Sequence, residues 1–289
     1  MNIIPALLLT LSAILAACKN ILIKSFSGFS IKNKEFFGLQ AIIFGAGSVI
    51  LLFINIFDFH GIALKTVICA MFYGLLLVCG QWLYTVALTN GKTGICATVY
   101  AFGFVIPTLS GAIFWSEKIT IFGALGILTV IPVLIISGLN KNQNNTSASK
   151  SYIIPLFFAM LCSGGLGIVQ KIHQKSEVAN QRNALILIAF LFAFTVSLIF
   201  FLTMKKGANQ ITRKNFVFCM LVGSFFSCCN MLNTYLSGVL DSAVFFPLIN
   251  IGSILSSLIL GLIVYKEKIT KKDAIVLVLG FLAIVLVNL

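Results

Sequence analysis

Long apolar stretches alternate with short polar connections along the whole chain. Each stretch is continuously apolar over about 18 residues or more, the length that a helix needs to cross the hydrocarbon core of a membrane. Strands of a membrane barrel would instead alternate polar and apolar residues, so the pattern favours helices. It predicts ten spans, with ends placed to within about two to four residues, at 3–23, 36–57, 66–89, 94–114, 120–138, 152–174, 184–204, 216–238, 242–264 and 272–289.

The pattern also repeats along the chain. Residues 115–120 and 265–270 share the run Glu-Lys-Ile-Thr and lie 150 positions apart. The same offset, applied without a gap, places Pro5 on Pro155. A chain that matches itself at one fixed offset is built from one structural unit that is used twice.

A polar stretch rich in Asn and Ser separates the two copies, and it lacks apolar periodicity, which is typical of a linker. We therefore predict an N-terminal five-helix repeat over residues 1–139, a polar linker over 140–151 and a C-terminal five-helix repeat over 152–289. Because five is odd, two tandem copies must enter the membrane from opposite sides, so the repeats are inverted. Inverted repeats around a central cavity are typical of secondary transporters.

The composition agrees with lipid as the solvent of this chain. Hydrophobic residues make up 60% of it and charged residues 9%, whereas a soluble domain carries roughly 25% charged residues. The net charge of +13 does not indicate a nucleic-acid partner, because Lys and Arg lie almost entirely in the connections, where they anchor helices at a membrane surface. Their excess on one side places both termini outside by the positive-inside rule.

The titratable residues do not form a catalytic or metal-binding pattern. All seven acids fall in connections or at span ends, and the sequence has no paired carboxylates and no Gly-rich phosphate loop. The eight cysteines lie inside apolar runs and form no CxxC pair, so we expect buried thiols and no metal. The sequence therefore predicts no catalytic residues and no cofactor, and it disfavours an enzyme.

Polar side chains inside the spans are the candidates for a binding site. A polar group in hydrocarbon is costly unless it is hydrogen-bonded, so such residues either join neighbouring helices or line a wet cavity. Both interpretations stay open for each of them. They are Asn20, Gln81, Trp82, Tyr84, Tyr100, Gln170, Asn230, Asn233 and Asn250.

Two lysines lie deeper in their spans than the other basic residues. Lys19 and Lys171 are the least easily explained by snorkelling to the headgroups, and either would favour an anionic or zwitterionic substrate if it faced a cavity. Small or helix-loosening residues recur every four positions on the fourth and ninth spans, which predicts close helix packing. These residues are Gly103, Pro107, Gly111, Ser253, Ser257 and Gly261.

Each predicted half has a Glu-Lys turn between its fourth and fifth helices, and the chain also contains Ala87-Leu88, Glu117 with Gly123 and Gly126, and the run at residues 261–267. With ten spans in two halves, these features resemble the drug/metabolite transporter superfamily, EamA-like branch. The resemblance implies alternating access around a cavity lined by the first, third and fourth helices of each half. Those helices hold Asn20, Gln81, Tyr84, Tyr100, Gln170, Asn230, Asn233 and Asn250.

We therefore expect a secondary transporter of a small polar or amphiphilic metabolite that works without ATP hydrolysis. An exporter of aromatic or lipophilic cations is the alternative, with Trp82, Tyr84, Tyr100 and Tyr235 as cation–π surfaces. A membrane-embedded enzyme or scaffold is the third. The expected partners are a small-molecule substrate and membrane lipid. A monomer suffices, a dimer stays open, and the expected location is the inner membrane of a bacterium.

Overall fold

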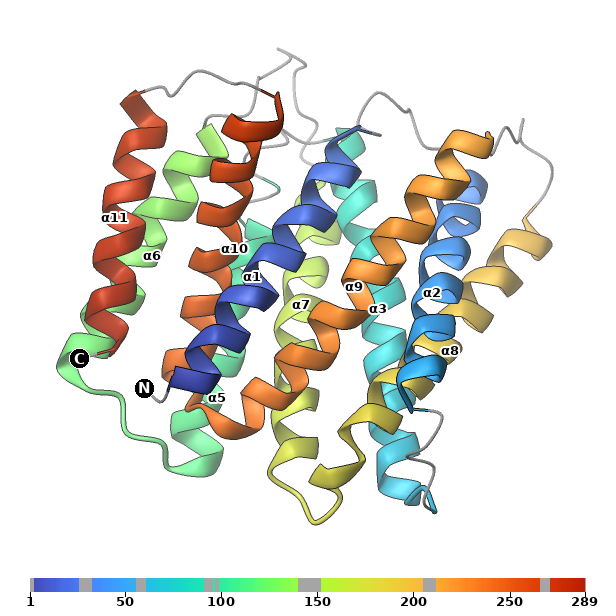
Figure 1. Cartoon of the computed structure of the whole chain (residues 1–289), viewed down its shortest axis with the longest axis horizontal. Helices are drawn as coiled ribbons and strands as arrows, with labels where there is room; N and C mark the ends of the chain where they lie inside the picture. Colours follow the sequence, from blue (N-terminus) through green and yellow to red (C-terminus); the bar gives the residue numbers. More distant parts are fainter. Residues whose placement is uncertain are drawn as a thin grey trace.

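The computed structural model describes residues 3–25, 33–55, 61–90, 96, 99–139, 152–204, 212–265 and 271–288. Within these ranges the regular secondary structure is entirely helical (Figure 1). The helices are α1 (Ile3–Ser25), α2 (Asn33–Asn55), α3 (Leu64–Asn90), η1 (Phe102–Phe104), α5 (Val105–Trp115), α6 (Ile121–Leu139), α7 (Ile153–Gln174), η3 (Ala179–Gln181), α8 (Arg182–Thr203), α9 (Arg213–Val239), α10 (Ser242–Tyr265) and α11 (Lys271–Asn288).

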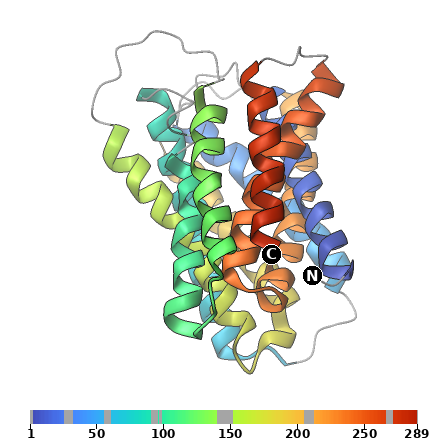
Figure 2. The same ribbon diagram turned by 90° about the vertical axis from the view of Figure 1, so that its left-hand side faces the viewer.

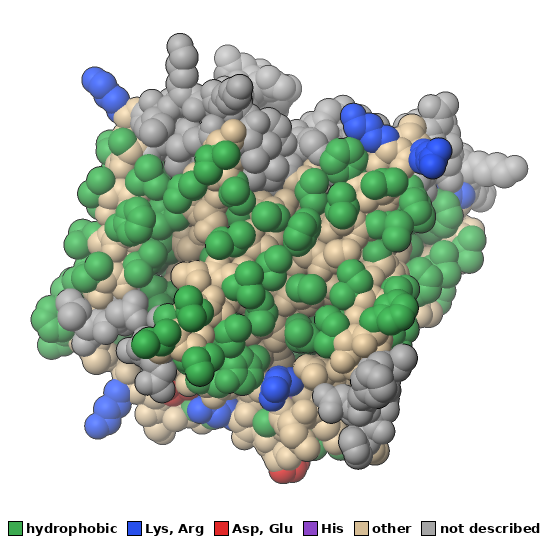
Figure 3. Space-filling view, in the orientation of Figure 1, with side chains coloured by type: hydrophobic (Ala, Val, Ile, Leu, Met, Phe, Trp, Pro, Cys, Tyr) green, Lys and Arg blue, Asp and Glu red, His purple; other side chains and the backbone are tan. Residues whose placement is uncertain are grey.

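Helix length and composition make this a membrane protein. Among the described residues, six helices are long and apolar enough to cross a membrane, within 3–20, 34–55, 64–88, 153–174, 179–203 and 213–239. Four further apolar helices are shorter within the described ranges: 99–115, 121–136, 242–257 and 274–286. The face drawn in Figure 3 carries a broad band of hydrophobic side chains, with Lys and Arg at its upper and lower edges. This is the distribution that a bilayer requires.

The helix boundaries recur along the chain. α1 begins at Ile3 and α7 at Ile153, so Pro5 and Pro155 occupy the same place in the first turn. A proline is tolerated there because the first-turn N–H groups have no partner within the helix. α5 ends at Trp115 and α10 at Tyr265, again 150 positions apart.

Several of the larger helix contacts occur twice, the second time between the helices that correspond to the first two in the other part of the chain. α1 packs on α9 and α10, while α7 packs on α3 and α5; likewise α2 packs on α9, and α3 on α8. α2 also packs on α8, and α6 lies beside α11, as Figure 2 shows. Figure 1 shows α1 starting at the lower edge of the bundle and α7 ending there. These two helices therefore run in opposite directions.

One predicted span differs from its counterpart. The expected helix over 94–114 is observed as an apolar helical segment from residue 99 to 115 that passes through the tight turn η1, whereas α10 is continuous. Gly103 lies inside η1, and a side chain there would collide with the carbonyl of Met160 on α7. This close approach positions η1 against α7. The predicted linker over 140–151 lies outside the described residues.

Candidate functional site

Four polar side chains of α3, α7 and α9 meet inside the bundle. The hydroxyl of Tyr73 donates to Oδ1 of Asn230 (2.6 Å) and accepts from Nε2 of Gln170 (2.9 Å). Gln170 also donates to the hydroxyl of Thr234 (3.0 Å). All four residues are buried. The structure thus brings together two of the predicted site residues, Gln170 and Asn230. It adds Tyr73, which the sequence alone does not distinguish from a core residue, because it lies in an apolar helix.

A second polar group joins α1 to α9 and α10. The hydroxyl of Ser12 donates to Oδ1 of Asn233 (2.5 Å), and the thiol of Cys229 lies beside both (3.4 Å from Oγ of Ser12). On the same helix, Nδ2 of Asn20 donates to the hydroxyl of Ser257 (3.3 Å). Asn20 is exposed and Asn233 half-buried, so these contacts leave both residues partly open.

Lys19 lies between these two contacts along α1. Its Nζ sits 4.6 Å from the ring centroid of Phe226, and that ring packs in turn on Phe44 and Phe190. Among the residues whose side chains the structure describes, no salt bridge involves Lys19. Lys19 is therefore half-buried, its ammonium group lies beside an aromatic face, and none of the described acidic side chains balances its charge.

Lys171, by contrast, is bound by an acid and a carbonyl of the protein. Its Nζ lies 2.6 Å from Oε1 of Glu117 and donates to the backbone carbonyl of Leu240 (2.9 Å). The Lys171 side chain is 0% exposed and that of Glu117 6%. The prediction that Lys171 attracts an anionic substrate therefore loses its basis in this structure, because its charge is already balanced.

The second oxygen of Glu117 accepts a hydrogen bond from the backbone N–H of Ser242 (2.7 Å), in the first turn of α10. A carboxylate at a helix N-terminus is stabilised by the unpaired N–H groups and by the helix dipole. Burial alone would raise the pKa of Glu117, but the hydrogen bonds from Lys171 and Ser242 outweigh it and hold the pKa below the usual value. Glu117 is therefore ionised at neutral pH.

The remaining predicted residues with polar or aromatic side chains lie on α3, in the helical residues just before η1, and on α10. Tyr84 packs on Tyr100, with ring centroids 4.6 Å apart. Gln81 accepts from Nε2 of Gln40 on α2 (2.8 Å), and the buried Nε1 of Trp82 has no hydrogen-bond partner among the described residues. Separately, Nδ2 of Asn250 donates to the carbonyl of Phe246 (2.9 Å) in its own helix.

The first set of small residues at four-residue spacing, Gly103, Pro107 and Gly111, packs mainly on α7. A side chain at Gly103 would meet Met160 and Ser163, and Pro107 lies against Gly167. Gly111 is the member that meets α10, because a Cβ there would collide with Ser242 and with the Glu117 carboxylate.

In the second set, on α10, Ser257 contacts α1 through Asn20, and Ser253 is half-buried. The surroundings of Gly261 lie outside the described side chains.

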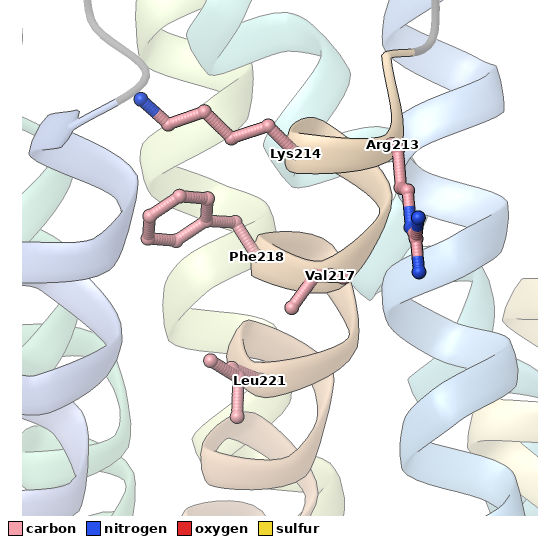
Figure 4. A pocket seen from close by; sticks show the side chains of 5 residues that line it. All are labelled: Arg213, Lys214, Val217, Phe218 and Leu221. Carbon is pink, nitrogen blue, oxygen red and sulfur yellow. The ribbon is translucent and has the colours of Figure 1, made fainter.

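A hollow of about 390 Å³ lies at the start of α9 (Figure 4). Its described wall combines two basic and three apolar side chains of that one helix: Arg213, Lys214, Val217, Phe218 and Leu221. Figure 4 shows Arg213 and Lys214 pointing to opposite sides of α9, so their charges do not converge on one point.

The comparisons agree with the helical architecture. Residues 150–289 match the EamA-like transporter family. A solved structure that bears only the description "Crystal structure of protein" is similar over 97% of this chain and 98% of its own, with a TM-score of 0.76 and 12% sequence identity. At that identity the likeness shows the fold alone. No curated protein matches the chain.

Proposed function

Since the chain belongs to the EamA-like transporter family and is thus a transporter of the drug/metabolite type, we propose that it moves a small anionic or zwitterionic metabolite by alternating access. Transport needs no ATP hydrolysis in this proposal. The observation that carries it is the unbalanced charge of Lys19 inside the helix bundle, between polar contacts of α1 with α9 and α10.

The architecture that goes with this function is ten spans in two inverted five-helix halves. Three observations support it: helix boundaries that recur 150 positions apart, helix contacts that recur between the corresponding helices, and the opposite directions of α1 and α7. In such folds the substrate lies near the midplane between the halves, and rocking of one half against the other exposes it to each side in turn. One chain contains both halves, so a monomer suffices.

Coupling to protons is not part of the proposal. None of the acids whose side chains the structure describes lies in the middle of a helix, where a proton-relay carboxylate would be expected. We therefore propose facilitated diffusion or exchange, in a bacterial inner membrane with both termini outside. Loss of uphill transport with intact exchange in Asp241→Asn would contradict this part.

Export of aromatic or lipophilic cations is the second candidate, favoured by the close pair Tyr84 and Tyr100. Tyrosine ring faces attract quaternary ammonium groups. However, the ring of Tyr235 is already occupied by the guanidinium of Arg182, 5.0 Å from its centroid. The free ammonium of Lys19 would also repel a cation, so the anionic or zwitterionic class fits the described residues better.

Ligand-induced thermal stabilisation of the purified protein separates the two. A panel of carboxylates, amino acids and phosphorylated metabolites should contain a stabilising compound, and quaternary ammonium compounds should not stabilise. The stabilisation should be lost in Lys19→Gln. Lys34→Gln is the matched control, because Lys34 also lies over a phenylalanine ring but donates to the carbonyl of Met204 (3.0 Å). Stabilisation by quaternary cations alone would reverse the assignment.

A further inference from the structure

The lower face of the bundle in Figure 1, which we call the terminus face, carries the start of α1 and the end of α11. It also carries three turns, at residues 116–120, 175–181 and 240–241. The first turn belongs to the N-terminal half and the other two to the C-terminal half. A contact between these turns therefore joins the two halves where they meet water.

Glu117 makes such a contact with both of its carboxylate oxygens. One oxygen is bound by Lys171, in the last turn of α7, and the other by the N–H of Ser242 at the start of α10. Lys171 extends the contact to the carbonyl of Leu240, at the end of α9. We call these four residues the latch. One carboxylate of the N-terminal half thus holds three helix ends of the C-terminal half.

The local backbone is shaped for this carboxylate. Ser116 adopts a left-handed conformation (φ 51°), and the N–H of Glu117 closes the turn on the carbonyl of Gly111 (3.2 Å). Gly111 has no side chain, and a methyl group there would occupy the space of the Glu117 carboxylate and of Ser242. The turn therefore directs Glu117 inward and not toward water, which is where a solvated loop acid would point.

The latch is also dry, and this makes it a two-state contact. Two buried opposite charges stabilise each other only while both stay together, and separating them leaves each uncompensated unless water enters. The neighbouring Lys65–Glu177 ion pair also joins the two halves on this face (3.0 Å), yet its side chains are 44% and 74% exposed. That pair can break and re-form in solvent at little cost.

We propose that the latch is the gate that keeps the terminus face closed in this structure and must open for alternating access. The inference rests on the proposed transport function, which requires that each face opens in turn. When the latch parts, α7 and α10 are released from the turn at 116–120, and water reaches Glu117 and Lys171.

Distance measurements between spin labels test the gate without any substrate. Lys118→Cys and Asn180→Cys place one label on each half at exposed positions of the terminus face, in full-length protein whose eight native cysteines are replaced by alanine. In Glu117→Gln/Lys171→Met, which removes both charges together, the distance distribution should shift to longer values. Lys65→Gln/Glu177→Gln is the matched control and should leave the distribution unchanged.

A second variant guards against misfolding of the first. Gly111→Ala keeps both charges but wedges the latch apart, so it should shift the distribution in the same direction. Thermal unfolding identifies which variants are folded. An unchanged distribution in the folded variants would overturn the gate, even if the protein transports a solute. A shifted distribution in a protein that transports no solute would support the gate and refute the proposed function.

Discussion

Lys19 and Lys171 lie near the C-terminal ends of two corresponding helices, α1 and α7, yet only the charge of Lys171 is balanced by a described acid. Lys171 is fully buried and balanced by Glu117, whereas Lys19 is half-buried beside Phe226 without an acid among the described side chains. An unbalanced charge inside a helical membrane protein is costly and is therefore a candidate for function. A balanced charge that joins four elements is a candidate for holding a conformation. We therefore propose that α1 binds the ligand and that α7 holds the protein closed.

The largest expected effect on stability comes from replacing Lys171. Lys171→Met leaves the buried Glu117 carboxylate without its cationic partner and should destabilise the protein by about 3–5 kcal/mol. Lys19→Met removes an unbalanced charge and leaves no buried charge behind, so it should leave stability unchanged or raise it. Chemical or thermal unfolding in detergent measures both. Equal stability of the two variants would contradict the distinction drawn between the lysines.

A second prediction asks whether the polar cluster of α7 serves the fold as Lys171 does. Tyr73→Phe removes the hydroxyl that joins Gln170 to Asn230, and both amides then lose a buried partner. We expect a loss of about 1–3 kcal/mol in unfolding free energy. Tyr84→Phe is the control, since no hydrogen bond of its hydroxyl is described, and it should cost less. If Tyr73→Phe changed ligand binding but not stability, the cluster would belong to the substrate site.

Lys19 should contribute directly to the affinity for an anionic ligand. For an anionic compound that stabilises the unmodified protein, the dissociation constant should rise about tenfold or more in Lys19→Gln, because an ion pair in a partly buried site is lost. Lys19→Arg should retain part of the affinity, since it keeps the charge. Isothermal titration calorimetry provides the values. An unchanged dissociation constant would remove Lys19 from the site.

The smallest expected effect is the pH dependence of the latch. Because the folded-state pKa of Glu117 is lowered, its contribution to stability is fully present above the unfolded value of about 4.3 and is lost as the pH falls through the lower folded value. The stability difference between the unmodified protein and Glu117→Gln/Lys171→Met should therefore be constant near neutral pH and shrink in acid. A melting-temperature series against pH measures it, and a difference that grows in acid would contradict the account.

The sequence predicted the helices well because each apolar run is long and bounded by polar turns. The expected span 152–174 is observed as Ile153–Gln174, and 242–264 as Ser242–Tyr265. Periodicity could also place Gln170 and Asn230 inside spans. It could not show that Tyr73 joins them, because hydrogen bonds between distant helices leave no local pattern in the sequence.

The latch was the main feature that the sequence did not reveal. The sequence places Glu117 beside a lysine in the polar connection after a span, where an acid is expected to face water. The left-handed Ser116 and the missing side chain of Gly111 turn it inward, and both act through three-dimensional packing. Likewise, the four-residue spacing predicted close packing of Gly103 and Pro107 but could not name α7 as the partner.

Solute counterflow in proteoliposomes tests the central claim most directly. Vesicles loaded with an unlabelled anionic or zwitterionic metabolite that stabilises the protein should transiently accumulate the labelled compound without ATP or an ion gradient, and Lys19→Gln should abolish the overshoot while Lys34→Gln retains it. Counterflow of quaternary ammonium compounds alone, or an overshoot unaffected by Lys19→Gln, would contradict the account.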